Sequence, residues 1–458
     1  MIRLHCGVVF CGCLAACLFM RGPAQAASLA REPATVKAIS IQVNHRQIWD
    51  GQCIVVTAQA HRAANAPAAG VRLQACVNGR PWCASQRTLA SGVVHLLVPL
   101  PEVGVNKITV VGPGAVSPPV AVQVKRRRFG IITDPNHLIG MEWEIWFGPG
   151  YAGWKSAEAM PVLGHYSSLD PRVLRQQTLW FNRMGINFVE VDWTNNLTQS
   201  FPSPAAKECI AANKVLFNLY RHMRQHPKIV FLMGPEHNYW MNRSTPYTGP
   251  WYTAQLNYVY KHFIANPKYK GLYLQYRGKP LLNLYLNGPR SSRPPQIHDP
   301  RFTIRYVGAW MQVTHENRYG VWSWYDQKPR PAYFHGDRND KVEALTVACG
   351  YPAVNAPGPG LNNWLSPDAG GKNYGQTYRT QWRAAFKYQP QFLFLCQFNE
   401  FAPPDEYDNN LNNDMEPTLL TPPGSKIPSG WGFEYVNLTR REIARYHTAI
   451  AQARAAQK

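Results

Sequence analysis

Acidic side chains follow the apolar segments of this chain, and the clearest case is Glu400. An apolar and aromatic run that begins at Phe392 stops abruptly at Asn399-Glu400, and two further carboxylates, Asp405 and Glu406, follow closely. A run of this kind is typical of a buried strand in a mostly parallel sheet. Barrel enzymes keep their catalytic groups at the C-terminal ends of such strands. Glu400 is therefore predicted to be a catalytic carboxylate, and the alternative is a structural carboxylate held by a neighbouring arginine.

Glu190 and Asp192 form a second acidic pair inside an apolar segment. Because side chains alternate along a strand, the two carboxylates share one face. Burying charge against helices is expensive, so this face is predicted to line a barrel interior. Asp192 is one candidate partner for Glu400, and Glu236 beside His237 is another. The alternatives are an Asp192 paired with a barrel arginine or lysine and a His237 that is a hydrogen-bonded structural residue.

Amide and aromatic side chains accompany the carboxylates at the same segment ends, and the first segment adds Glu142 and Glu144. Glycoside cleavage needs two carboxyl groups flanking one bond, about 5 Å apart for retention or roughly 6.5–9.5 Å for inversion. Carboxylates, amides and flat rings together suit carbohydrate. Phosphate chemistry is disfavoured because no Gly-rich loop is present, and acyl transfer because there is no G-x-S-x-G. No paired C-x-x-C occurs, so a zinc site is not expected. The predicted site includes no metal and no cofactor.

The predicted substrate-binding side chains combine rings, amides and one histidine. For the rings, packing in the core is the alternative. They are Tyr166, Trp193, Asn195, His237, Tyr285, Trp324 and Asn399.

Eight apolar segments with helical patterns between them predict a (β/α)8 TIM barrel over residues 129–458, an α/β fold. The segments are residues 141–147, 186–193, 228–234, 280–286, 302–310, 320–325, 343–351 and 392–401. An open doubly wound sheet is the alternative, but Gly148-Pro149-Gly150 does not fit the phosphate loop that such sheets usually carry.

Local signals predict where two of the helices begin. Asp170-Pro171 supplies an N-cap followed by proline at the first helical position, and Gly185 is expected to end that helix. A capping box from Thr439 to Glu442 predicts the start of the final helix.

Residues 36–125 predict an immunoglobulin-like β-sandwich domain before the barrel, because about six short strands occur there with turn signals between them. The Asn78-Gly79 pair predicts a hairpin, and the flanking Cys76 and Cys83 could close a small disulfide loop. The simplest role for this domain is a spacer or a cap.

The N-terminal residues 1–26 predict a signal peptide, with an apolar stretch and the cleavage pattern Ala24-Gln25-Ala26. Export to the periplasm or the extracellular space is expected, and lipid attachment at Cys17 is the alternative. No later segment is long and apolar enough to predict a transmembrane span. The formal net charge of +21 favours anionic polymers such as acidic polysaccharides. Nucleic acid is disfavoured because the basic residues are dispersed.

Several motifs together resemble glycoside hydrolase family 99 and the related family 71-like barrels. Residues 161–170, P-V-L-G-H-Y-S-S-L-D, are similar to the family segment P-x-L-G-x-Y-S-S-x-D. Residues 397–401, Q-F-N-E-F, look like its S-[FW]-N-E-[WF], and Glu416-Pro417 resembles its later E-P. The resemblance covers roughly residues 140–450.

This resemblance implies a (β/α)8 barrel that cleaves α-mannosidic or α-glucosidic linkages without a redox cofactor. In family 99 the motif reads N-E-W-H-E, and both Glu residues act in catalysis. Glu400 matches the first, but Pro403 stands at the second position. Asp405, Glu406, Asp192 or Glu236 would then have to serve instead.

The function expected from the sequence is an exported glycoside hydrolase acting on a polysaccharide or glycan. A carbohydrate-binding barrel without catalysis and a structural surface protein on the same fold are the alternatives. The sequence leaves open the sugar, the linkage and the oligomeric state.

Overall fold

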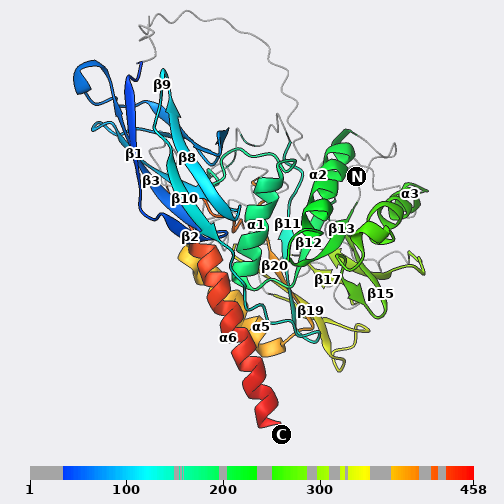
Figure 1. Cartoon of the computed structure of the whole chain (residues 1–458). Coiled ribbons are helices and arrows are strands. Elements are labelled where there is room, and N and C mark those ends of the chain that lie inside the picture. The colour runs from blue at the N-terminus through cyan, green and yellow to red at the C-terminus, as the bar shows by residue number, and fades with distance from the viewer. Residues whose placement is uncertain are drawn as a thin grey trace, which may run out of the picture.

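The computed structural model describes residues 35–148, 154, 157, 159–194, 204–234, 250–285, 297–308, 320–324, 329–350, 373–401, 414–420 and 430–457. Two mostly antiparallel sheets at the N-terminal side are followed by a mixed α/β part (Figure 1). The predicted leader and the lipid-attachment site at Cys17 lie outside the described residues. None of the described helices combines the length and apolar character needed to cross a membrane.

The N-terminal strands form two sheets that share one apolar core. Every second residue of the nine-residue strand β3 is buried, as expected for a strand with one face on a core. The first sheet has the order β1 (Ala38–Val43), β3 (Cys53–His61), β7 (Val93–Pro99). The second has the order β2 (Gln47–Trp49), β10 (Val120–Lys125), β8 (Gly104–Gly112), β4 (Arg72–Val77), β5 (Arg80–Pro81), with β6 (Gln86–Arg87) on β4 and β9 (Ala115–Val116) on β8.

All six predicted strands of this region are present, and four short ones join them. Asn78 and Gly79 both have positive φ (51° and 77°) and connect β4 to β5, which confirms the predicted hairpin. Cys76 and Cys83 are free thiols, so the predicted disulfide is wrong. A β-sandwich is therefore present, while its immunoglobulin type stays a prediction.

A nearly closed barrel of parallel strands follows. Each of the eight predicted apolar segments overlaps one of its strands. They are β11 (Leu138–Trp143), β12 (Phe188–Trp193), β13 (Lys228–Met233), β15 (Lys279–Tyr285), β16 (Thr303–Gly308), β17 (Trp322–Ser323), β19 (Val342–Ala348) and β20 (Phe392–Cys396). The short β14 (Gln275–Tyr276) and β18 (Ala332–Tyr333) pair antiparallel with β15 and β19. The hydroxyl of Thr346 donates to the carbonyl of Ser323 and links β19 to β17, where the sheet would otherwise be open.

Helices cover the outside of the barrel (Figure 1). They are α1 (Pro171–Met184), α2 (Pro204–Tyr220), α3 (Pro250–Val259), α5 (Gln376–Tyr388) and α6 (Glu434–Ala456), with short turns η1 (Ala63–Asn65), η4 (Tyr260–Ile264), η5 (Pro267–Tyr269) and η8 (Asn373–Gly375).

The start of α1 is confirmed: Asp170 Oδ1 accepts from the Arg172 N–H at 2.8 Å, and Gly185 ends the helix at φ 99°. The predicted start of α6 at Thr439 is wrong, because the helix begins five residues earlier at Glu434. The Thr439 hydroxyl lies inside the protein, 3.0 Å from the Tyr378 hydroxyl of α5. A local capping pattern was therefore outweighed by packing between two helices.

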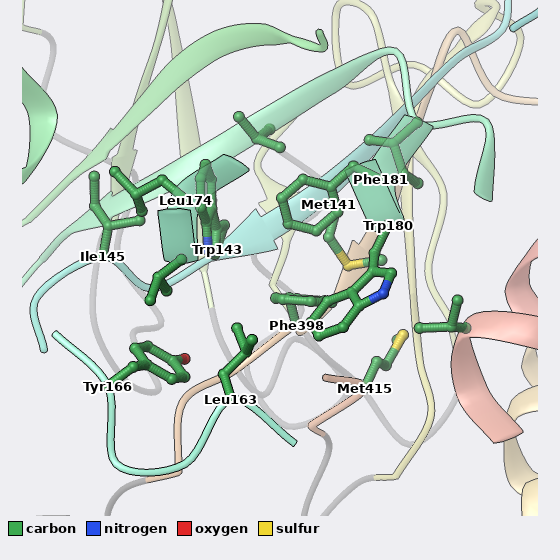
Figure 2. Close-up of a cluster of buried hydrophobic side chains, with 14 of the residues drawn as sticks. Met141, Trp143, Ile145, Leu163, Tyr166, Leu174, Trp180, Phe181, Phe398 and Met415 are labelled. Carbon is green, nitrogen blue, oxygen red and sulfur yellow. The ribbon is translucent and has the colours of Figure 1, made fainter. Parts of the chain in front are cut away.

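The two faces of β11 have opposite characters, and this difference positions the site. Met141, Trp143 and Ile145 point outward into the apolar layer beneath α1 (Figure 2). The Trp143 ring meets Phe181 of α1 edge to face at 5.1 Å. Because side chains alternate, Glu142 must then point into the barrel.

The lower barrel interior is filled by aromatic rings. Phe188, Trp322, Phe392 and Phe394 pack together there. Gly140 lies directly beside Phe188 in the paired strands, and any side chain at this position would collide with the Phe188 ring. The next inward positions on these two strands are occupied by carboxylates.

The N-terminal sheets contact the barrel through α1. The Gln176 side chain donates to the Gly51 carbonyl at 3.1 Å, and the Arg172 guanidinium lies 4.9 Å from the centre of the Trp82 ring. The Asp50 carboxylate accepts from the Arg127 N–H at 2.7 Å. Helix α1 is thus packed between the sandwich on one side and β11 on the other.

Candidate active site

Carboxylates of β11 and β12 lie at the C-terminal ends of these strands, inside the barrel. Glu142 and Glu190 are partners in the strand register, and Glu144 and Asp192 lie two residues further along. None of the four side chains is more than 3% exposed. The interior position predicted for Glu190 and Asp192 is therefore what the structure shows, and β11 contributes a matching pair.

Three of these groups approach one another closely. One carboxylate oxygen each of Glu142, Glu144 and Asp192 lies within 4.8 Å of the other two. In the part of the chain that the structure describes, no lysine or arginine forms an ion pair with any of them. The negative charge of the cluster must be neutralised in another way, by bound protons or by a cation.

Burial keeps protons on this cluster. It is the main reason why the pKa of Glu144 lies well above its usual range, and the charges of Asp192, Glu142 and Glu400 add to the effect. Burial and the same kind of repulsion also raise the pKa of Glu142. Burial raises the pKa of Asp192 to about 7, although hydrogen bonds from Thr194 oppose the shift. Protonated carboxyl groups at neutral pH are what general acid catalysis needs.

Hydrogen bonds distinguish the members of the cluster. Glu142 accepts from the Trp324 indole N–H and, at 3.0 Å, from the Cys396 thiol. Asp192 accepts from the N–H and the hydroxyl of Thr194.

Glu144 differs from its neighbours, since neither of its carboxylate oxygens has a hydrogen-bond partner among the described residues. A buried polar group without a partner is costly. Its two oxygens are therefore the ones most in need of a bound molecule.

Asn399 positions Glu144 through the backbone. Its side-chain oxygen accepts from the Glu144 N–H, and its NH2 group donates to the Glu144 carbonyl, both at 3.0 Å. The same NH2 group donates to the Tyr166 hydroxyl at 2.7 Å. The Tyr166 hydroxyl in turn donates to Glu416 at 2.6 Å, and Gln177 of α1 donates to the other oxygen of Glu416 at 3.1 Å. This network ties the extensions of β11 and β20 together.

Glu400 follows directly and is only partly buried. The Gln397 side chain donates to the Glu400 carboxylate, and the backbone N–H of Glu400 donates to Asp414. A second bond to Asp414 comes from the Phe401 N–H at 3.2 Å. The charge of Glu400 contributes to the raised pKa of Glu144, and Glu400 is the more exposed of these two carboxylates.

Two predicted aromatic residues, Trp324 and Tyr285, also reach this site. Their rings meet edge to face at 5.2 Å, with the Trp324 N–H on Glu142. Beneath Trp324, a cavity of about 10 Å³ borders both Glu142 and Glu190, with room for roughly one water molecule.

The structure places two predicted substrate-binding rings elsewhere. Trp193 is fully buried in the outer apolar layer against Phe231 and Phe263, which leaves it no surface to offer a ligand. The Tyr166 ring is also buried, and its hydroxyl belongs to the network that supports Glu144. Both corrections have the same cause: an aromatic residue near a strand end can pack on the helix side of the barrel.

The remaining predicted residues, Glu236, Asp405, Glu406, Asn195 and His237, lie outside the described residues. Sequence reasoning had placed Glu142 and Glu144 at a strand end but had not selected them as catalytic. The signal available was the pattern Glu142-Trp143-Glu144, in which two carboxylates flank an apolar residue within an apolar segment.

The same three carboxylates are also the group that could hold a metal ion. Carboxylate oxygens suit Ca²⁺, which takes about six to eight oxygen ligands, and Mg²⁺, which takes about six. Glu142, Glu144 and Asp192 would supply three of these. The sequence predicted no metal, and proton sharing satisfies the same electrostatic requirement.

Several solved structures are similar to this one. The structure is similar to the GH99 endo-alpha-mannosidase from Bacteroides thetaiotaomicron, both in complex with BIS-TRIS-propane (TM-score 0.49) and in a second structure (TM-score 0.47). In each case the identity is 14%, and the match covers 70% of this chain and 100% of that chain. It is also similar to a glycoside hydrolase-like protein, at TM-score 0.45 and 13% identity, over 69% of this chain and 96% of the other.

No protein-family model matches the chain, and the search of curated proteins found no match.

Proposed function

We propose that the chain is an exported glycoside hydrolase that cleaves a neutral polysaccharide or glycan. The observation that carries this proposal is the carboxyl cluster at the C-terminal ends of the barrel strands, in which Glu144 has two buried oxygens that no described residue contacts by a hydrogen bond. Barrel enzymes place their chemistry at this end. Export is supported by the pattern of residues 1–26 and follows as part of the proposal.

Glu144 and Glu400 are the proposed pair of catalytic carboxyl groups. Glu144 is the proton donor, because burial and the charges of Asp192 and Glu142 keep its pKa high. Glu400 is the second group and the more exposed of the two. A glycosidic bond bound between them would have one carboxyl group on each side, as hydrolysis requires. Asp192 acts through Glu144 by keeping it protonated.

The charge of the site favours a neutral substrate. Several carboxyl groups gather here, and no lysine or arginine among the described residues forms an ion pair with the Glu142, Glu144 and Asp192 cluster. A uronate or a phosphorylated sugar would be repelled as soon as the cluster lost a proton. The Trp324 ring beside Glu142 offers an apolar face on which a sugar could stack. The resemblance in the motifs points to α-linked mannan or glucan as the first substrates to test.

The test is hydrolysis of a panel of α-mannans and α-glucans by the wild type and by Glu144→Gln and Glu400→Gln. Each substitution keeps the size of the side chain and removes its ability to exchange a proton, so both should lower kcat by at least about a hundredfold. Glu102→Gln is the matched control, because Glu102 is an exposed carboxylate of the N-terminal sheets. Full activity in Glu400→Gln or Glu144→Gln would refute the assigned pair. Binding of these glycans without any cleavage by the wild type would favour a carbohydrate-binding barrel.

A further inference from the structure

A second cavity lies far from the carboxyl cluster, between the N-terminal sheets and the outside of the barrel. Its volume is about 540 Å³, within the roughly 300–1,000 Å³ of ordinary ligand sites. The segment from Asn44 to Cys53 forms one wall, and α1 and α6 contribute Arg183 and Asn437 to the other. Figure 1 shows β2 beside the N-terminal end of α6, where this cavity opens.

Arg183 gives the cavity a positive charge, and no described carboxylate forms an ion pair with it. It is half-buried at the end of α1 and donates to the side-chain oxygen of Asn437 at 3.4 Å. Its charged neighbours are Arg440 and Arg127, and burial followed by the charge of Arg440 lowers its pKa. A guanidinium in this setting gains more from an anion than a solvated one would.

Trp49 supplies an aromatic face at the same cavity. Trp49 is 45% exposed, and every other described tryptophan is less exposed. The backbone N–H of Trp49 donates to the side-chain oxygen of Gln52 at 2.9 Å, which fixes the turn that carries the ring. Such a ring is a platform for the flat apolar face of a sugar. Gln52 and Asn437 add amide groups that suit hydroxyls.

We propose that this cavity binds an acidic saccharide, with the carboxylate of a hexuronate unit on Arg183 and its ring on Trp49. The proposal does not rest on the hydrolytic function, since no residue of the carboxyl cluster lines the cavity. It also gives the positive net charge of the chain a specific place to act. Acidic polysaccharide would be held at the junction, away from the carboxyl cluster.

The test uses the full chain and a matched pair of ligands in titration calorimetry: tetragalacturonate and its fully methyl-esterified, neutral form. The acid should bind, and the ester should bind at least about tenfold more weakly, because the charge-assisted hydrogen bond is lost. Arg183→Gln and Trp49→Ala should each weaken binding of the acid at least about tenfold. Arg221→Gln removes an exposed arginine at the end of α2 and should bind like the wild type. Thermal melting of each variant shows that it is folded.

Any one of four results would overturn the proposal. The first is no binding of the acid, and the second is equal binding of acid and ester. The third is equal affinity in Arg183→Gln and Arg221→Gln, which would reduce the effect to net charge. Sodium sulfate serves as the bare anion: if it binds as tightly as tetragalacturonate, the cavity recognises an anion and not a saccharide.

Discussion

Replacing Asn399 by alanine should both displace Glu144 from its position in the site and lower the stability of the fold. The substitution removes three hydrogen bonds: two to the backbone of Glu144 and one to the Tyr166 hydroxyl, at 2.7–3.0 Å. Asn399 is fully buried, so water cannot replace the lost bonds freely. At about 1 kcal/mol for each lost bond, with more for groups left unpaired, the unfolding free energy should fall by about 3–5 kcal/mol. A misplacement of Glu144 by about 1 Å would lower kcat roughly a hundredfold.

Asn106→Ala is the matched control for this prediction. Asn106 is also buried, and its side chain makes comparable bonds to the Glu102 and Gly104 carbonyls and to Asn78, but it lies in the N-terminal sheets. Thermal or urea unfolding gives the stability of both variants, and steady-state kinetics on the best substrate of the panel gives kcat. We expect both variants to be destabilised, but only Asn399→Ala to lose kcat. A stable Asn399→Ala with normal kcat, or an equal loss of kcat in both, would show that Asn399 does not position Glu144.

Three further predictions concern protonation, stacking and metal ions. Burial raises the pKa of Glu190 to about 8, so its proton stabilises the folded state at low pH, and this contribution is lost as the pH rises through the window from about 4 to 8. Unfolding free energies measured across that window should fall less steeply in Glu190→Gln, and an unchanged slope would contradict the shift. Trp324→Phe keeps a ring but loses the N–H bond to Glu142, so its KM should stay within about threefold of the wild-type KM. Trp324→Ala loses the ring and should raise KM at least about tenfold, measured by steady-state kinetics. Equal KM values in the two variants would exclude stacking. If protons neutralise the cluster, EDTA and millimolar Ca²⁺ or Mg²⁺ should leave the activity and the melting temperature unchanged. A melting temperature that rises with Ca²⁺ in the wild type but not in Glu144→Gln would assign a cation site instead.

The barrel strands could be predicted because their signal is local. Each predicted segment is an apolar run, and each overlaps one of the buried parallel strands, with starts that differ by up to three residues. The start of α1 is equally local, because Asp170 caps it within two residues. The start of α6 was missed because it depends on contacts distant in sequence. Thr439 fits a capping pattern, yet its hydroxyl is committed to Tyr378 on another helix.

The site could be predicted only in part, for a similar reason. Alternation along β12 correctly placed Glu190 and Asp192 inside the barrel, and the motif correctly brought Asn399 and Glu400 to the same end of it. The special position of Glu144 could not be predicted, because it follows from the missing hydrogen bonds of its oxygens among the residues that the structure describes. The assignment of Trp193 failed because its composition and place in the strand do not reveal which side of the barrel receives the ring.

The bonds between Asn399 and Glu144 also determine when the site can form during synthesis. The two residues are 255 positions apart, and β11 completes its pairing only with β20, where Ile139 lies beside Leu393. A ribosome must therefore translate nearly the whole barrel before the first carboxylates acquire their final neighbours. Until then the β11 segment, with Glu142 and Glu144 among large apolar residues, has one edge unpaired and is a target for chaperones. A nascent chain released before β20 would contain most of the acidic residues of the site, but their carboxyl groups would not be held together in one cluster.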